Sequence, residues 1–250
     1  MSARSGVEVA SKARTSRAPA ISPARVLGAL PLIGWASLFW FLLFTGRTPL
    51  YLGARTQWLV GVGAAILTAA ALGRLASLRE TSPARVTAGR AWGTALLLVP
   101  VVLVTSLPPA SLTSYAVGRR STVSSGGISS TGDIGKGDLT LVDVASALAS
   151  RPTMKALVQR AGSTESFKGF VDMVPGESAD EFELTRFVVT CCVADAIAAQ
   201  VRVVGAAPGT FHPDQWVRVT GTIYPLGQQI ILVADKVVGV AKPSRPYLYP

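Results

Sequence analysis

Three long apolar runs dominate the N-terminal part of the chain, and shorter alternating runs follow them. The long runs are Val26–Phe44, Trp58–Leu78 and Ala91–Leu107. A helix rises about 1.5 Å per residue and the hydrocarbon core of a bilayer is about 30 Å thick, so each run is long enough to cross a membrane. The pattern therefore predicts a transmembrane region over residues 26–107, with the first run an uncleaved span and not a signal peptide.

Five shorter segments in the C-terminal half alternate apolar and polar residues or are rich in β-branched residues, as strands are. Five short strands in roughly 100 residues are typical of a small closed barrel, so we expect an OB-like barrel domain over residues 138–250. A short helix, Leu139–Ala149, is predicted before the first strand. The predicted strands are Ser166–Met173, Phe182–Thr190, Val201–Val204, Trp216–Tyr224 and Gln229–Val237.

Residues 108–137 connect the two parts and are rich in Gly, Ser and Pro. This composition buries too little apolar surface to fold by itself, so we predict a flexible linker. The predicted fold class is thus membrane α plus soluble β. Three N-terminal transmembrane helices are followed by a C-terminal five-stranded OB-like barrel domain.

The net charge of +10 is unevenly distributed along the chain. Residues 1–130 hold thirteen Lys and Arg and two acids, giving +11, whereas residues 131–250 hold eleven and twelve, giving −1. The C-terminal half therefore lacks a basic surface for phosphates, which argues against a nucleic-acid partner. Because Lys and Arg near spans mark the cytoplasmic side, we predict a cytoplasmic basic tail over residues 1–25 and an extracytoplasmic domain at the cell membrane.

Cys191 and Cys192 are the only cysteines, and Asp195 follows them. Four interpretations are open. Successive side chains of a strand point to opposite faces, so one thiol is buried and the other partly exposed. The pair forms a vicinal disulfide in an oxidising compartment. It binds zinc or copper with Asp195, and with His212 as a further ligand, although CxxC spacing is missing. Or one thiol is catalytic. Asp195 alternatively caps a following turn.

His212 is the only histidine, and its Pro-Asp setting is more typical of a solvated turn residue than of a ligand. A single histidine removes most His-dependent catalytic schemes. The sequence also contains no Gly-rich phosphate loop, HExxH or GxSxG motif. We therefore expect that the protein is not an enzyme. We also expect that Trp216 is a core residue.

The C-terminal half contains the pattern RFxxxCCxADA, a WVxVxG strand and the ending PYLY. In this order they resemble the YcgQ-like family of bacterial membrane proteins, the smaller subunit of a two-component permease. The resemblance implies an accessory subunit in the lipid bilayer whose partner is a larger multi-span permease. Tyr247 and Tyr249 are expected as surface aromatics that dock on the domain or the membrane interface. The candidate functional residues are Arg186, Phe187, Cys191, Cys192 and Asp195, with Pro246, Tyr247 and Tyr249 at the C-terminus.

Overall fold

The computed structural model describes residues 23–77, 87–107, 111–119, 134, 137–174, 176, 178–227 and 229–250. Most of the predicted basic tail, residues 1–25, and much of the predicted linker lie outside the described residues. The chain divides into two compact units, of which one includes Ala64–Leu103 and the other is Phe39–Gly63 with Val104–Pro250. The connection between the first two helices therefore belongs to the same unit as the C-terminal domain.

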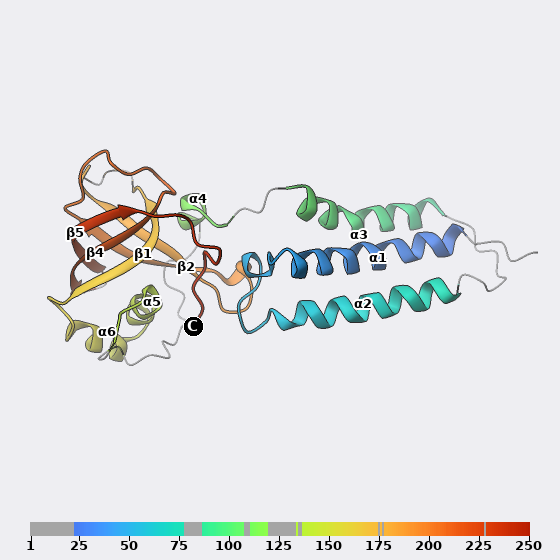
Figure 1. The fold of residues 1–250 in the computed structure, drawn as a ribbon, viewed down its shortest axis with the longest axis horizontal. Coiled ribbons are helices and arrows are strands. Elements are labelled where there is room, and N and C mark those ends of the chain that lie inside the picture. Colours follow the sequence, from blue (N-terminus) through green and yellow to red (C-terminus); the bar gives the residue numbers. More distant parts are fainter. Residues whose placement is uncertain are drawn as a thin grey trace, which may run out of the picture. The chain divides into compact units, whose positions relative to one another are not determined.

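Among the described residues, three helices are long and apolar enough to cross a membrane. They are α1 (Pro23–Phe44), α2 (Trp58–Ala76) and α3 (Ala88–Ser106) (Figure 1). Their apolar stretches have mean hydropathies of 2.0, 1.8 and 1.6. No residue of α3 as described is buried, and its large side chains such as Leu96 are exposed, as suits a helix surrounded by lipid. The three helices confirm the predicted spans and are compatible with a multi-pass membrane protein.

The small residues of α2 are used unevenly. Ala64 and Ala71 are buried, and a Cβ atom added at Gly63 would press against the Phe39 ring. A Cβ atom at Gly61 would instead meet open space. Close helix contacts through small side chains therefore occur along part of this helix only.

The C-terminal domain is a closed five-stranded barrel, as predicted (Figure 1). The strand order is β1-β2-β3-β5-β4, with β3 and β5 parallel and every other pair antiparallel. Each of these strands is paired on both sides, which removes the exposed edges of an open sheet. The strands are β1 (Thr164–Asp172), β2 (Phe182–Val188), β3 (Ile197–Val204), β4 (Trp216–Leu226) and β5 (Gln229–Gly239).

Apolar side chains at alternating strand positions fill the barrel. Two helices, α5 (Leu141–Ala149) and α6 (Arg151–Val158), pack against it and add Val144 and Leu157 to the core. A capping box between Thr140 and Asp143 starts α5. The fully buried strand residues include Val171, Leu184, Thr185, Ala199, Val201, Val203, Val217, Val219, Ile223 and Leu232.

The outer face of the barrel carries a second apolar cluster, which we call the outer cluster. The Phe170 ring centroid lies 5.9 Å from that of Phe187 and 6.0 Å from that of Trp216. Val117, from the short helix α4 (Ser114–Val117), and Tyr247 cover these rings. Trp216 is thus a core residue, as expected. The full cluster is Val117, Phe170, Phe187, Val189, Ala196, Ala198, Trp216 and Tyr247.

The structure contains two short helices that the sequence analysis did not assign. We expected no helix beyond Ala149, but α6 follows at once with Pro152 in its first turn, where the missing proline N–H has no helical partner to lose. The predicted linker contains α4, because Val117 is buried in the outer cluster and Leu112 packs against it. Composition alone does not reveal such a short docked segment.

Candidate functional site

The candidate site lies in the turn between β2 and β3, and we call residues 190–195 the cysteine turn. Strand β2 ends at Val188, and the turn closes with a single 3-10 segment, Val193–Asp195. Cys192 precedes this segment, and its carbonyl oxygen accepts the Asp195 N–H at 3.0 Å. Strand β2 therefore ends two residues before the predicted end at Thr190, whose N–H donates to the Asp195 carboxylate and not to a neighbouring strand.

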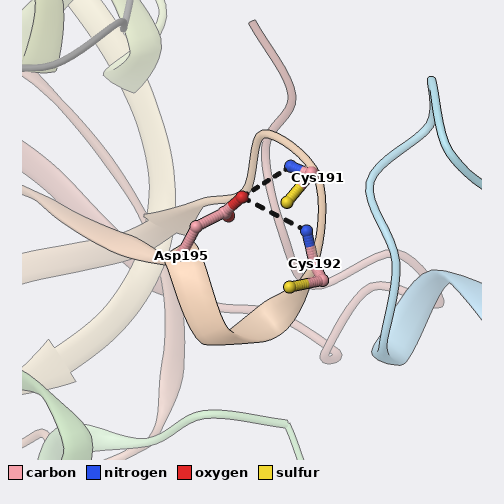
Figure 2. Close-up of side chains that lie close together, drawn as sticks. All are labelled: Cys191, Cys192 and Asp195. Atoms are coloured by element: carbon pink, nitrogen blue, oxygen red, sulfur yellow. Dashed lines mark hydrogen bonds between the residues drawn. The ribbon is translucent and has the colours of Figure 1, made fainter.

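The Asp195 carboxylate holds the cysteine turn together. Its Oδ1 accepts the Thr190 N–H at 3.1 Å. Its Oδ2 accepts the N–H groups of Cys191 at 2.7 Å and Cys192 at 3.3 Å (Figure 2). Burial raises the pKa of this carboxyl, but hydrogen bonds from the Cys191 thiol and these N–H groups outweigh it, so the pKa falls below its ordinary value. Asp195 is thus an ionised acceptor that organises the preceding turn.

Both thiols are free and accessible. Cys191 is exposed and Cys192 is half-buried, so the interpretation with one cysteine buried in the core is wrong. The two sulphurs and a carboxylate oxygen of Asp195 lie within 4.8 Å of one another, and Figure 2 shows both sulphurs on the side of the turn that faces the carboxylate. A hydrogen bond to Asp195, followed by one to Cys192, raises the pKa of the Cys191 thiol to about 11. A thiol with such a pKa is a poor nucleophile at neutral pH, which disfavours a catalytic role.

The connection between α1 and α2, residues 45–57, is hydrogen-bonded to the cysteine turn, and we call it the docking loop. Leu52 and Cys192 form an antiparallel bridge. The Gly53 N–H donates to the Cys191 carbonyl at 2.9 Å, and the Thr56 hydroxyl donates to the same oxygen at 2.6 Å. The one peptide that joins the two cysteines is therefore held by a loop more than a hundred residues away in sequence.

Close backbone contact fixes the register of this docking. The Val193 N–H donates to the Tyr51 carbonyl at 2.8 Å. A Cβ atom at Gly53 would overlap the Thr190 carbonyl oxygen, so only glycine allows the two backbones to lie so near each other. The docked segment requires this glycine for space and not for a left-handed conformation.

The docking loop also places the cysteine turn near the start of a predicted membrane span. Thr56 precedes Trp58, the first residue of α2, by two positions. Since an extended chain covers at most about 3.5 Å per residue, the Cys191 carbonyl lies within about 10 Å of the start of α2. The thiols therefore belong to the end of the domain that adjoins the span.

Arg186 and Phe187, the other candidate residues of this motif, are not at the cysteine turn. The Arg186 guanidinium donates to the carbonyls of Pro246 at 2.9 Å and Arg245 at 3.0 Å, and lies 5.6 Å from the Trp216 ring centroid. Burial lowers the pKa of this guanidinium. Phe187 is buried in the outer cluster. Both residues fasten the C-terminal segment to the barrel.

The C-terminal motif is likewise a structural fastening. Pro246 and Tyr247 are buried, and the Tyr247 hydroxyl accepts the Leu112 N–H at 3.0 Å. The Tyr249 hydroxyl donates to the Pro49 carbonyl of the docking loop at 3.2 Å, and burial raises the pKa of this phenol. Tyr247 docks on the domain, which is one of the two expected positions, but it is buried in the outer cluster and is not a surface residue.

His212 lies apart from the thiols. Its side chain is exposed in the loop between β3 and β4. The backbone N–H of His212 donates to the Gln215 side-chain oxygen at 3.0 Å. Among the described residues, the group of ligand atoms at the cysteine turn comprises Cys191, Cys192 and Asp195. The sequence-based preference for a turn residue over a ligand agrees with this position.

The donor chemistry of the site is mainly that of a thiol pair. A carboxylate has about four acceptor positions, and Asp195 already accepts three N–H groups and the Cys191 thiol. The two sulphurs therefore remain as the available ligands for a soft metal ion. The docking loop, which sequence reasoning missed, was signalled only by the apolar run Leu50-Tyr51-Leu52 before Gly53.

Comparison with known proteins places the site within one recognised domain. No curated protein matches the chain. Among protein families, the match begins in α6 and covers all five strands, the cysteine turn and the C-terminal motif. The chain therefore carries, over residues 152–250, a DUF1980 C-terminal domain.

Proposed function

We propose that this protein is an accessory membrane subunit of a two-component permease, in which three helices anchor an exported OB-like domain beside a larger multi-span partner. The docking of the α1–α2 connection on the cysteine turn carries the proposal. It holds an accessible thiol pair near the membrane, where a partner's loops and its substrate are within reach. The DUF1980 match is consistent with the YcgQ-like resemblance that first suggested a permease subunit.

The helices support a role in a complex. The three predicted spans have no ionisable residue at their centres, so they offer no ion or proton path of their own. They do offer large exposed apolar faces, such as that of α3, to lipid and to partner helices. A subunit that anchors and presents a domain fits these features better than a transporter on its own.

Copurification tests the proposal. The tagged full-length protein is solubilised in mild detergent, and accompanying proteins are identified by mass spectrometry. We expect a large multi-span protein in comparable amount, reduced when Cys191→Ser and Cys192→Ser are combined. Ser178→Ala, at an exposed position of the C-terminal domain, is the matched control and should retain the partner. A protein that purifies alone from its native membrane would refute the permease-subunit proposal.

Thiol labelling tests the orientation. In a background with both native cysteines changed to serine, we expect Arg55→Cys in the docking loop and Ser178→Cys in the barrel to react with a membrane-impermeant maleimide on intact cells. Both positions are exposed. Ser11→Cys in the basic tail should react only after lysis. Labelling of the tail on intact cells would overturn the exported placement of the domain.

A second candidate function is an extracytoplasmic metal-binding membrane protein that uses the Cys191–Cys192 pair for zinc or copper. The approach of three potential ligand atoms to within 4.8 Å favours it. Metal analysis of the purified full-length protein tests it. About one ion per chain, lost when both cysteines become serine, is the expected result, and metal retained by that variant would refute it.

A further inference from the structure

The peptide between Cys191 and Cys192 is held at both ends. Its carbonyl oxygen accepts the Gly53 N–H at 2.9 Å and the Thr56 hydroxyl at 2.6 Å. Its N–H, that of Cys192, donates to Asp195 at 3.3 Å. These bonds come from the docking loop on one side of the peptide group and from the 3-10 segment on the other. The orientation of this one peptide is thus set jointly by two parts of the chain.

This orientation matters because adjacent side chains normally diverge. In extended backbone, successive residues point to opposite faces, and Cys192 is itself extended, with φ −152° and ψ 165°. The two sulphurs nevertheless lie within 4.8 Å of each other. Hydrogen bonds from the docking loop and to the Asp195 carboxylate accompany this convergence and together fix the conformation of the turn.

The geometry and chemistry of the pair select a class of ion. A metal–sulphur bond of about 2.3 Å allows two sulphurs on one ion to be at most about 4.6 Å apart, so the thiols need to move little to share an ion. Zinc in structural sites takes four protein ligands, whereas Asp195 already carries its hydrogen bonds. Cu(I) is soft, prefers thiolates and is satisfied by two of them.

We propose that the cysteine turn and the docking loop together form a Cu(I) site, in which ion binding and loop docking stabilise each other. The thiolates of Cys191 and Cys192 bind the ion, and each thiol releases its proton to solvent. Asp195, Gly53 and Thr56 are positioning residues that hold the sulphurs on one side. The inference rests on the metal-binding candidate above and requires no permease partner. Because coupling between binding and docking is reciprocal, occupancy of the site is communicated to the connection between α1 and α2.

Affinity measurements on the full-length protein in detergent test the site. Under anaerobic conditions, with Cu(I) buffered by a competing chelator, we expect one ion per chain. Cys191→Ser and Cys192→Ser should each weaken binding about a hundredfold or more. Gly53→Ala keeps both thiols but disfavours docking, so its affinity should fall about tenfold or more, since apparent affinity scales with the population of the competent state. Gly61→Ala should bind as the wild type does.

Hydrogen exchange provides a readout independent of affinity. Addition of Cu(I) should slow exchange of the Gly53 and Val193 amides in the wild type, and have no effect when both cysteines are serine. Equal Cu(I) binding by the double serine variant would overturn the site and the metal-binding candidate together. Wild-type affinity in Gly53→Ala, or unchanged exchange on loading, would overturn the coupling while metal binding by the pair stands.

Discussion

Replacement of Gly53 by alanine separates docking of the α1–α2 connection from the fold of the barrel. The added methyl group would overlap the Thr190 carbonyl oxygen, which belongs to backbone and has no flexible end that can move aside. The docking loop and the cysteine turn must therefore move apart far enough to remove this overlap. The barrel core lies elsewhere, so its packing is left in place.

Three hydrogen bonds set the magnitude. Separation of the two segments lengthens or breaks three hydrogen bonds. The Gly53 N–H donates to the Cys191 carbonyl at 2.9 Å, the Val193 N–H to the Tyr51 carbonyl at 2.8 Å, and the Thr56 hydroxyl to the Cys191 carbonyl at 2.6 Å. A hydrogen bond contributes a net stabilisation of about 1 kcal/mol, so loss of all three costs up to about 3 kcal/mol. Since 1.4 kcal/mol is a factor of ten, local opening of the docked segment should become about a hundredfold more frequent.

Native-state hydrogen exchange of the full-length protein in detergent measures this opening. The Val193 amide, which is protected by Tyr51, should exchange about a hundredfold faster in Gly53→Ala than in the wild type. Amides within the barrel strands should keep their protection, and Gly61→Ala should leave Val193 unchanged. Wild-type protection of Val193 in Gly53→Ala would refute the claim that close backbone approach holds the loop.

Three further predictions concern the cysteine turn and the C-terminal segment. In the metal-free protein, alkylation of Cys191 at pH 8, measured by mass spectrometry, should be about a hundredfold slower than for a thiol of pKa 9.0. The alkylation rate should rise tenfold per pH unit until about pH 11. A rate that stops rising near pH 9 would contradict this prediction. Asp195→Ala removes the hydrogen bond that contributes most to the raised pKa of Cys191, so alkylation at pH 8 should accelerate. Tyr247→Phe leaves the Leu112 N–H without its acceptor and should cost about 1 kcal/mol, seen as a Tm lower by a few degrees, whereas Tyr224→Phe at an exposed position should leave Tm unchanged.

The fold was predictable where burial imposes a simple period. The spans are uninterrupted apolar runs, and β4 follows the predicted Trp216–Tyr224 alternation because one face of each barrel strand is buried. Strand β3 begins at Ile197, before the predicted Val201, because Ala198 and Ala199 are small residues with little strand preference that packing alone recruits. Strand propensity does not predict residues that become part of a strand only through pairing and packing with neighbouring strands.

The candidate site was predictable only in its local part. Cys191, Cys192 and Asp195 are close in sequence, so their proximity in space follows from one short turn. The structural roles of these residues could not be predicted from the sequence. Asp195 accepts backbone N–H groups, and Arg186 donates to carbonyl groups of the C-terminal segment. A pairing between residues separated by about 140 positions carries no periodic signal, which is why the docking loop was missed.

The docking loop also constrains topology independently of charge. Segments joined by backbone hydrogen bonds must lie on the same side of a membrane, so the α1–α2 connection and the barrel share a compartment. This requires α2 and α3 together to cross the bilayer an even number of times, as two spans do. The charge rule then decides only on which side of the membrane both segments lie, and in the orientation that we propose this side is the outside. Under the coupling that we propose, this loop, which is hydrogen-bonded to the peptide between the two cysteines, links the thiol pair to the membrane helices.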